Sequence, residues 1–162
     1  MTIISTQRLN ISSFTYDDVP FIIELLNEPD FYRFIGDKNV RTIEQAKQYL
    51  TTGPMKSMEE HGFALMKVAT KSGQTIGMCG LLKREEYDYP DIGYAFLKQF
   101  YRQGYGFESV KATLEHFKDI RPLLALTNTD NTASQQLLLK AGFVAQKGIS
   151  PESNTKIFQL FR

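Results

Sequence analysis

Hydrophobic and polar positions along the chain follow two periods, one typical of strands and one typical of helices. Seven runs are predicted to be strands, because their apolar residues alternate with polar ones or form a short unbroken block. These runs lie at residues 8–12, 63–70, 75–82, 91–97, 122–128, 143–149 and 155–161. Apolar residues spaced three or four apart predict four helices, at 15–27, 42–50, 107–117 and 132–141.

Local signals mark the ends of two of these helices. Thr42 followed by Gln45 has the pattern of a capping box, in which each residue bonds the main chain of the other. Thr132 followed by Gln135 has the same pattern at the start of the last helix. Gly142 is expected to end that helix in the left-handed conformation.

The order of these elements predicts a mixed α/β fold. The strand at 91–97, the helix at 107–117 and the strand at 122–128 permit one parallel pair of strands among otherwise antiparallel neighbours. No repeat, low-complexity segment or flexible linker interrupts the sequence. We therefore expect residues 1–162 to form a single domain.

Composition narrows the function classes. The chain is 42% hydrophobic and 23% charged with a formal net charge of +1, so it has no excess positive charge for nucleic acid or an anionic membrane. It contains no apolar run as long as a membrane span, and its N-terminus lacks the apolar core of a signal peptide. Cys79, the single cysteine, lies in an apolar run and predicts a buried structural thiol; together with two distant histidines it offers no metal site. A cytoplasmic protein without metal, nucleic-acid or membrane partners is expected.

The segment YRQGYGFESV at 101–110 carries the clearest chemical signal. Gly104 and Gly106 stand between a predicted strand and a predicted helix, where they allow a ligand to approach the main chain. First-turn amides of a helix attract anions such as phosphate. A tight turn is the simpler interpretation of two glycines alone. The segment lacks the Gly-Lys-Ser/Thr that ends a P-loop. It also lacks the third glycine of a dinucleotide-binding fingerprint, because Ser109 stands at that position.

The same stretch resembles the acyl-CoA loop of the GNAT N-acetyltransferases, Arg/Gln-x-x-Gly-x-Gly/Ala. More narrowly, DIGYAFLKQFYRQGYGFES resembles the branch of the ribosomal-protein acetyltransferases RimJ and RimL. NTASQQLLLKAGF at 131–143 and TQRLNI at 6–11 are similar to two further motifs of that branch, in family order. The resemblance implies the GNAT fold, a largely antiparallel sheet of six to seven strands with a splayed parallel pair formed by the fourth and fifth, and with helices on both faces.

The resemblance also implies a reaction. Acetyl-CoA would be the cosubstrate, and its acetyl group would pass directly to a primary amine in a ternary complex. The acceptor would be a protein N-terminal α-amine or a small-molecule amine, and a homodimer is compatible with the family. The implied cofactor contacts are Phe96, Leu97, Arg102, Gln103, Gly104, Tyr105, Gly106, Phe107, Asn131 and Ser134.

A base must take a proton from the amine before the amine can attack. Asp91 occupies the acidic position before I-G-Y and is the first candidate. Glu86, with its neighbour Glu85, is the second, and an exposed acidic hairpin is the alternative interpretation of this cluster. Ser134 would protonate or hydrogen-bond the departing thiolate. Ser134 and Asn131 also suit ordinary roles at the start of a helix.

The sequence departs from the family pattern at several positions. Tyr101 fills the Arg/Gln position of the loop, and Leu138 stands where many relatives have a tyrosine as general acid. The connection KGISPESNTK at 147–156 lacks a tryptophan-containing segment. A bulge around Tyr94 and Ala95 is expected to present N–H groups to the developing oxyanion. An acyl-CoA-binding module without turnover is the second function that these residues leave open.

Overall fold

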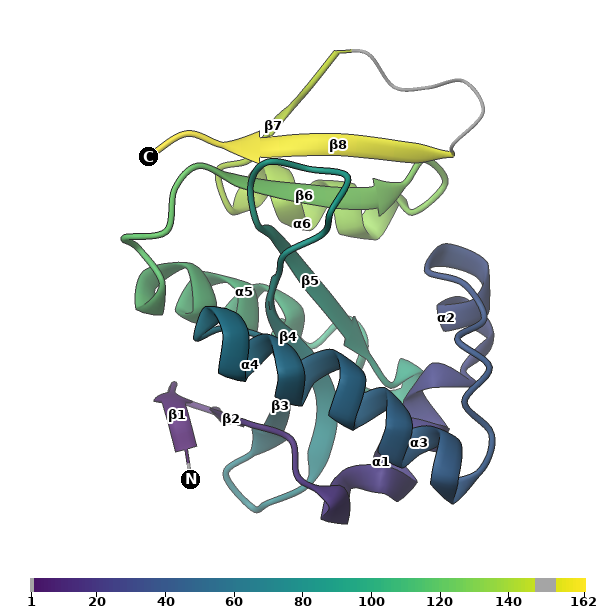
Figure 1. Ribbon diagram of the computed structural model, residues 1–162. Helices are drawn as coiled ribbons and strands as arrows, with labels where there is room; N and C mark the ends of the chain where they lie inside the picture. Colours follow the sequence, from purple (N-terminus) through teal and green to yellow (C-terminus); the bar gives the residue numbers. More distant parts are fainter. Residues whose placement is uncertain (1, 148–153) are drawn as a thin grey trace.

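One twisted sheet organises the computed structural model, which describes residues 2–147 and 154–162 (Figure 1). The strand order is β1-β2-β3-β4-β5-β6-β8-β7, and among these described strands only β5 and β6 pair in parallel. The mixed α/β class, the largely antiparallel sheet and the parallel pair are therefore confirmed. The strands are β1 (Thr2–Ser5), β2 (Leu9–Ser12), β3 (Leu65–Thr70), β4 (Thr75–Leu82), β5 (Asp91–Phe96), β6 (Leu123–Asn128), β7 (Val144–Ala145) and β8 (Thr155–Leu160).

The sheet has eight strands, where the sequence predicted six or seven. The additional strand is β1, which pairs with β2 and buries only Ile4. A run of four residues is too short for its alternation to stand out, so pairing with β2 decides its conformation. At the other end of the sheet, β7 keeps two residues of the strand predicted at 143–149. Residues 148 and 149 of that prediction lie outside the described residues.

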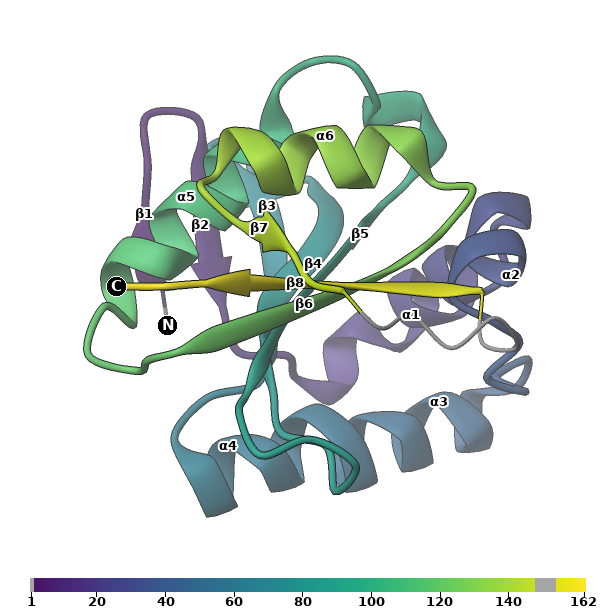
Figure 2. The same ribbon diagram turned by 90° about the horizontal axis from the view of Figure 1, so that it is seen from above.

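Helices cover both faces of the sheet, as predicted. Figure 2 shows α5 and α6 on one side and α3 and α4 on the other. The helices are α1 (Val19–Leu26), α2 (Pro29–Phe34), α3 (Ile43–Leu50), α4 (Lys56–His61), α5 (Tyr105–His116) and α6 (Thr132–Lys140), with 3₁₀ turns at Tyr16–Asp18 and Lys98–Phe100.

Helix α3 begins with the predicted capping box but continues beyond its predicted end. The main-chain N–H of Gln45 donates to Thr42 Oγ1 at 3.1 Å, and the N–H of Thr42 donates to Gln45 Oε1 at 3.2 Å. Beyond Leu50 the chain passes through a π turn, Thr51–Met55, into α4. Pro54 lies inside this turn, where it provides no N–H and its ring would clash with the carbonyl four residues earlier in a regular helix. The wider π turn accommodates the proline.

The capping box predicted at the start of α6 is wrong. Asn131 is the N-cap, and its Oδ1 accepts a hydrogen bond from the main-chain N–H of Ser134 at 3.2 Å. Thr132 consequently lies inside the helix, and the Gln135 side-chain amide donates to the carbonyls of Thr129 and Asn128 at 2.9 and 3.3 Å. The helix is followed by Gly142 with φ +99°, which confirms the predicted left-handed residue.

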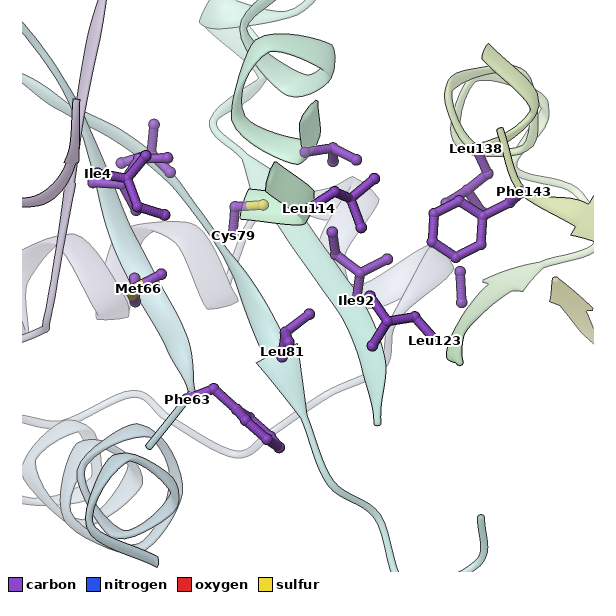
Figure 3. Close-up of a cluster of buried hydrophobic side chains, with 14 of the residues drawn as sticks. Ile4, Phe63, Met66, Cys79, Leu81, Ile92, Leu114, Leu123, Leu138 and Phe143 are labelled. Carbon is purple, nitrogen blue, oxygen red and sulfur yellow. The ribbon is translucent and has the colours of Figure 1, made fainter. Parts of the chain in front are cut away.

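A buried hydrophobic cluster lies on each face of the sheet. The cluster on the α5 and α6 face surrounds Cys79 and includes Ile92, Leu114 and Leu138 (Figure 3). Cys79 is fully buried, and burial raises the pKa of its thiol to about 12. The thiol is therefore structural, as predicted. The cluster on the other face joins α1 and α3 to Met78 of β4.

Strand β5 separates these two clusters, and it leaves its parallel neighbour after a short contact. Tyr94 and Phe96 pack toward the α5 and α6 face, whereas Ala95 and Leu97 pack toward α1 and α3. The register of β5 with β6 covers only the pairs Asp91–Leu124 and Ile92–Ala125. Beyond them the two strands diverge, as Figure 1 shows.

Candidate active site

The divergence of β5 and β6 coincides with a cavity of about 1270 Å³. Residues of α5 and α6 line it on one face of the sheet, and residues of α2, α3, the π turn and α4 line it on the other. The lining includes Asp91, Ser134 and the glycine loop, which lie far apart in the sequence. A ligand in this cavity can therefore reach both faces through the opening between the strands.

The predicted acyl-CoA loop forms the N-terminus of α5. Gly104 is the N-cap, and Tyr105, Gly106 and Phe107 make the first turn. The N–H of Glu108 donates to the Gly104 carbonyl at 3.0 Å, so the three preceding amides lack an intrahelical acceptor. Within the described residues, no side chain caps this end of the helix. Because the loop lines the cavity, its unpaired amides and the helix dipole provide a site for an anionic group.

The two positions of the loop require glycine for different structural reasons. Gly104 has φ +83°, a left-handed conformation that a side chain would strain. At Gly106 a Cβ would lie 3.1 Å from Leu137 Cδ1 and 3.8 Å from Phe96 Cε2. Gly106 therefore allows α5 to approach α6 and β5 closely. The approach of a phosphate to these amides stays a prediction.

One main-chain edge of β5 faces the opening. The N–H of Leu97 donates to the Ile76 carbonyl at 3.0 Å, so this pair is hydrogen-bonded in the antiparallel register of β4 and β5. Alternation then directs the N–H and C=O groups of Tyr94 and Phe96 away from β4. An extended ligand can pair with those groups, whereas the N–H of Leu97 is already engaged. The register is continuous, so the bulge predicted around Tyr94 and Ala95 is wrong; strand divergence exposes this edge instead.

Ser134 lies in the first turn of α6 and contacts a side chain that the sequence analysis missed. Its Oγ is 2.7 Å from the Tyr94 hydroxyl, which also donates to the Ser134 carbonyl at 3.3 Å. Burial raises the pKa of Tyr94, and its hydrogen bond to Ser134 offsets this only in part, so the hydroxyl stays protonated. The tyrosine of I-G-Y was the available signal. Leu138, which stands where many relatives have a tyrosine, has an apolar side chain that is only 1% exposed and packs in the core (Figure 3). It therefore cannot act as the general acid.

Asp91 begins β5 and is held by Arg84. Arg84 Nε donates to Oδ1 at 3.0 Å, and Nη2 donates to Oδ2 at 3.3 Å. Only 1% of Asp91 is exposed, whereas 42% of the Arg84 side chain is exposed. Burial raises the pKa of Asp91 above its ordinary value, because the ion pair with Arg84 compensates incompletely for lost hydration. A carboxylate with a raised pKa is a stronger base than an ordinary one.

The structure does not bring Glu86 into the cavity. Glu85 and Glu86 are exposed in the loop between β4 and β5, and neither lines the cavity. Glu86 acts on Asp91 through its charge, which contributes to the raised pKa of Asp91. This placement fits the alternative interpretation of the two glutamates as an exposed hairpin.

Asp91 and Ser134 approach the cavity from opposite faces of the sheet. Alternation along β5 places Asp91 on the same face as Ala95, which packs toward α1 and α3. Tyr94 extends to the other face, where its hydroxyl meets Ser134 on α6. The opening between β5 and β6 is therefore flanked by a carboxylate on one side and two hydroxyls on the other.

Some of the remaining residues predicted to contact the cofactor line the cavity, and others do not. Phe96, Arg102 and Asn131 do, whereas Leu97 and Gln103 do not. The main chain of Gln103 is engaged, because its carbonyl accepts a hydrogen bond from Arg8 at 2.9 Å.

The face that carries Asp91 has an aromatic lining. Helix α2, which was not predicted, contributes Phe31, Tyr32 and Phe34, and α3 contributes Tyr49. Burial raises the pKa of Tyr49 to about 12, and its hydroxyl has no hydrogen-bond partner within residues 2–147 and 154–162. In the sequence, Tyr49 was indistinguishable from a core residue of an amphipathic helix.

Within residues 2–147 and 154–162, no three His, Cys, Asp or Glu side chains form a group that could hold a metal ion, and no helix is long and apolar enough to cross a membrane. The connection at 147–156, expected to shape the acceptor pocket, lies mostly outside the described residues, which omit 148–153.

Comparison with known proteins identifies the class. The model of an acetyltransferase (GNAT) domain matches residues 8–144, so the chain belongs to the GNAT acetyltransferase family. It is 26% identical over 145 residues to the uncharacterized N-acetyltransferase YoaA of Bacillus subtilis (strain 168), covering 87% of this chain and 82% of that protein.

Solved structures show the same fold. RimL, a ribosomal-protein α-N-acetyltransferase in complex with coenzyme A, has a TM-score of 0.83 at 15% identity, over 99% of this chain and 98% of that chain. A GNAT-family acetyltransferase from Bacillus anthracis has a TM-score of 0.77 at 22% identity, over 99% of this chain and 98% of that one. The predicted family resemblance is confirmed. The protein is an acetyltransferase, and acetyl-CoA is the acetyl donor that its family uses.

Proposed function

We propose that this enzyme transfers the acetyl group of acetyl-CoA to a primary amine by direct attack in a ternary complex. One observation carries the proposal: the cavity at the strand opening is lined by the glycine loop and Ser134 on one face and by Asp91 on the other. Two reactants can therefore enter from opposite faces and meet between β5 and β6. Holding them in this way replaces a bimolecular encounter by an oriented one.

The donor side is suited to acetyl-CoA. The amides of Tyr105, Gly106 and Phe107 would bind the pyrophosphate at the N-terminus of α5. The open edge of β5 at Tyr94 and Phe96 would pair with the extended pantetheine as an added strand. The same edge directs the N–H of Tyr94 toward the opening, where it would stabilise charge developing on the thioester oxygen.

The acceptor side would supply the base. Asp91 would take a proton from the ammonium form of the acceptor, directly or through water, because only the neutral amine is nucleophilic. Its raised pKa suits this role, and Arg84 fixes the orientation of its carboxylate. On the donor side, Ser134 would give a proton to the departing thiolate, and its contact with the Tyr94 hydroxyl allows that proton to be replaced.

The lining of the acceptor face favours an amine attached to an apolar group. Aromatic side chains of α2 and α3 form much of this wall. Lys56 and Arg84 line the same side and are paired with Glu60 and Asp91, so these two carboxylates already have cationic partners and are poorly placed to bind a second positive charge on the acceptor. We therefore propose an apolar small amine or a peptide N-terminus with an apolar side chain as acceptor, rather than a polyamine.

An acyl-CoA-binding module without turnover is the second candidate. The observation that favours it is the burial of Asp91 beneath Arg84, which limits direct access to the base. Turnover requires that a water or the acceptor itself reach Asp91 beside the guanidinium.

One experiment separates the two. Thiol release from acetyl-CoA is measured with a panel of apolar amines, polyamines and N-terminal peptides, and acetyl-CoA affinity is measured by calorimetry. Transfer to an apolar member supports the enzyme, and preference for polyamines contradicts the acceptor class. Tight acetyl-CoA binding with no release for any acceptor would favour the binding module. The absence of acetyl-CoA binding would falsify both.

A further inference from the structure

Arg8, which lies just before β2, contacts the acyl-CoA loop from about 100 residues away in the sequence. Its Nε donates to Glu108 Oε1 at 2.7 Å, and its Nη1 donates to the carbonyl of Gln103 at 2.9 Å. The guanidinium also lies over the ring of Tyr105, 4.4 Å from its centroid. These contacts fall on both sides of Gly104, so one side chain spans the loop.

Glu108 is engaged from a second direction. Its Oε2 accepts hydrogen bonds from Thr6 Oγ1 at 2.6 Å and from the main-chain N–H of Arg8 at 3.1 Å. Burial alone would raise the pKa of Glu108, but the bonds from Thr6 and Arg8 and the charge of Arg8 outweigh burial and hold it below its ordinary value. The turn between β1 and β2 is thereby fixed to the first turn of α5.

The loop has a conformation that requires such support. Arg102 has φ +62° and Gly104 has φ +83°, so two left-handed residues flank Gln103. A non-glycine residue such as Arg102 keeps this conformation only where its surroundings enforce it. The bond from Arg8 to the Gln103 carbonyl holds the residue between them.

Charge provides a second reason for the contact. Glu108 lies in the first turn of α5, beside the amides that would bind a phosphate. An unpaired carboxylate there would repel the anion, and the guanidinium of Arg8 neutralises it. Arg8 does not line the cavity and is therefore placed to act on the loop rather than on the ligand.

We propose that Arg8 is a positioning residue for acetyl-CoA: through Glu108, Gln103 and Tyr105 it holds the glycine loop in the conformation that binds the pyrophosphate. This inference rests on the proposed function of the loop as the cofactor site. It also gives a physical link between the TQRLNI segment and the YRQGYGFESV segment, which are separate in the sequence.

The test measures acetyl-CoA affinity by calorimetry and the melting temperature without ligand, for wild type, Arg8→Lys and Arg8→Ala. Arg8→Lys keeps the charge but cannot bond Glu108 and Gln103 with a planar fork. We expect both variants to bind acetyl-CoA about tenfold or more weakly, the usual scale for losing a hydrogen bond to a charged group. Arg41→Ala is the matched control, because Arg41 is a half-exposed arginine paired with Asp37 outside the cavity. It should leave the affinity unchanged.

A double-mutant cycle of Arg8→Lys and Glu108→Gln tests whether Arg8 positions the loop or binds acetyl-CoA directly. If Arg8 acts through Glu108, the losses in Arg8→Lys and Glu108→Gln should be less than additive in the double variant. Additive losses, or Arg8→Lys binding acetyl-CoA as tightly as wild type, would overturn the inference. A lower melting temperature with unchanged affinity would also overturn it, since that is the result of a purely structural contact. Failure of the wild type itself to bind acetyl-CoA would reject the cofactor site and the inference together.

Discussion

Substitutions at the two loop glycines test whether each is needed for the reason that the structure gives. In Gly106→Ala the new Cβ would lie 3.1 Å from Leu137 Cδ1, the tip of a partly exposed side chain that can move by a few tenths of an ångström. Alanine also favours the helix relative to glycine, by up to about 0.5–1 kcal/mol in a helix interior. We expect Gly106→Ala to keep both stability and acetyl-CoA affinity.

Two companion variants should behave differently. Gly106→Val adds two more carbons at the contact with Leu137, and overpacking of this kind costs roughly 1–3 kcal/mol. Gly104→Ala forces alanine into φ +83° and places its Cβ 3.2 Å from Arg8 Nη2. The left-handed conformation alone costs about 1–2 kcal/mol, which lowers the melting temperature by roughly 2–8 °C for a chain of this size. Both variants should also bind acetyl-CoA more weakly, because the loop or α6 shifts.

Differential scanning fluorimetry and calorimetric titration with acetyl-CoA measure these effects. Equal losses of affinity in Gly106→Ala and Gly106→Val would refute the packing argument, because the Cβ would then face the ligand rather than Leu137. An unchanged melting temperature in Gly104→Ala would refute the argument from φ.

Four further predictions concern residues that line the cavity. Asp91→Asn should lower kcat/KM by roughly 10²-fold, because the base is lost. In the wild type the rate should fall as the pH drops through the raised pKa of Asp91, and the variant should lack this fall. An unchanged rate in the variant would exclude Asp91 as the base. Because this pKa is raised on folding, the unfolding free energy of the wild type, relative to Asp91→Asn, should decrease as the pH rises through it, which denaturant titrations at several pH values can measure. Ser134→Ala should reduce kcat less than Ser134→Ala combined with Tyr94→Phe, since the tyrosine hydroxyl remains as a donor; equal rates for the single and double variants would argue against that role. Tyr49→Phe should raise KM for the acceptor a few-fold, which is roughly the effect of losing one hydrogen bond, and should leave acetyl-CoA affinity unchanged. A change in acetyl-CoA affinity instead would place Tyr49 on the donor side.

Local periodicity was sufficient for most of the fold. Alternation in β5 and the helical spacing in α5 depend on neighbours along the chain, so the strand–helix–strand unit and its parallel pair could be predicted. Elements that depend on distant partners could not. Strand β1 is stabilised by pairing with β2, and the helix after Leu50 continues because a π turn accommodates Pro54.

The sequence by itself determined the family, through three motifs in order, and the position of the glycine loop at a helix N-terminus. Only the tertiary structure decided what surrounds that loop and the candidate base. The contact of Tyr94 with Ser134 joins residues 40 positions apart, and that of Arg8 with Glu108 joins residues 100 positions apart. The pKa of Asp91 likewise depends on burial and on Arg84. Such contacts leave no local periodicity, because they arise from the way β5 diverges from β6 and the helices pack around the opening.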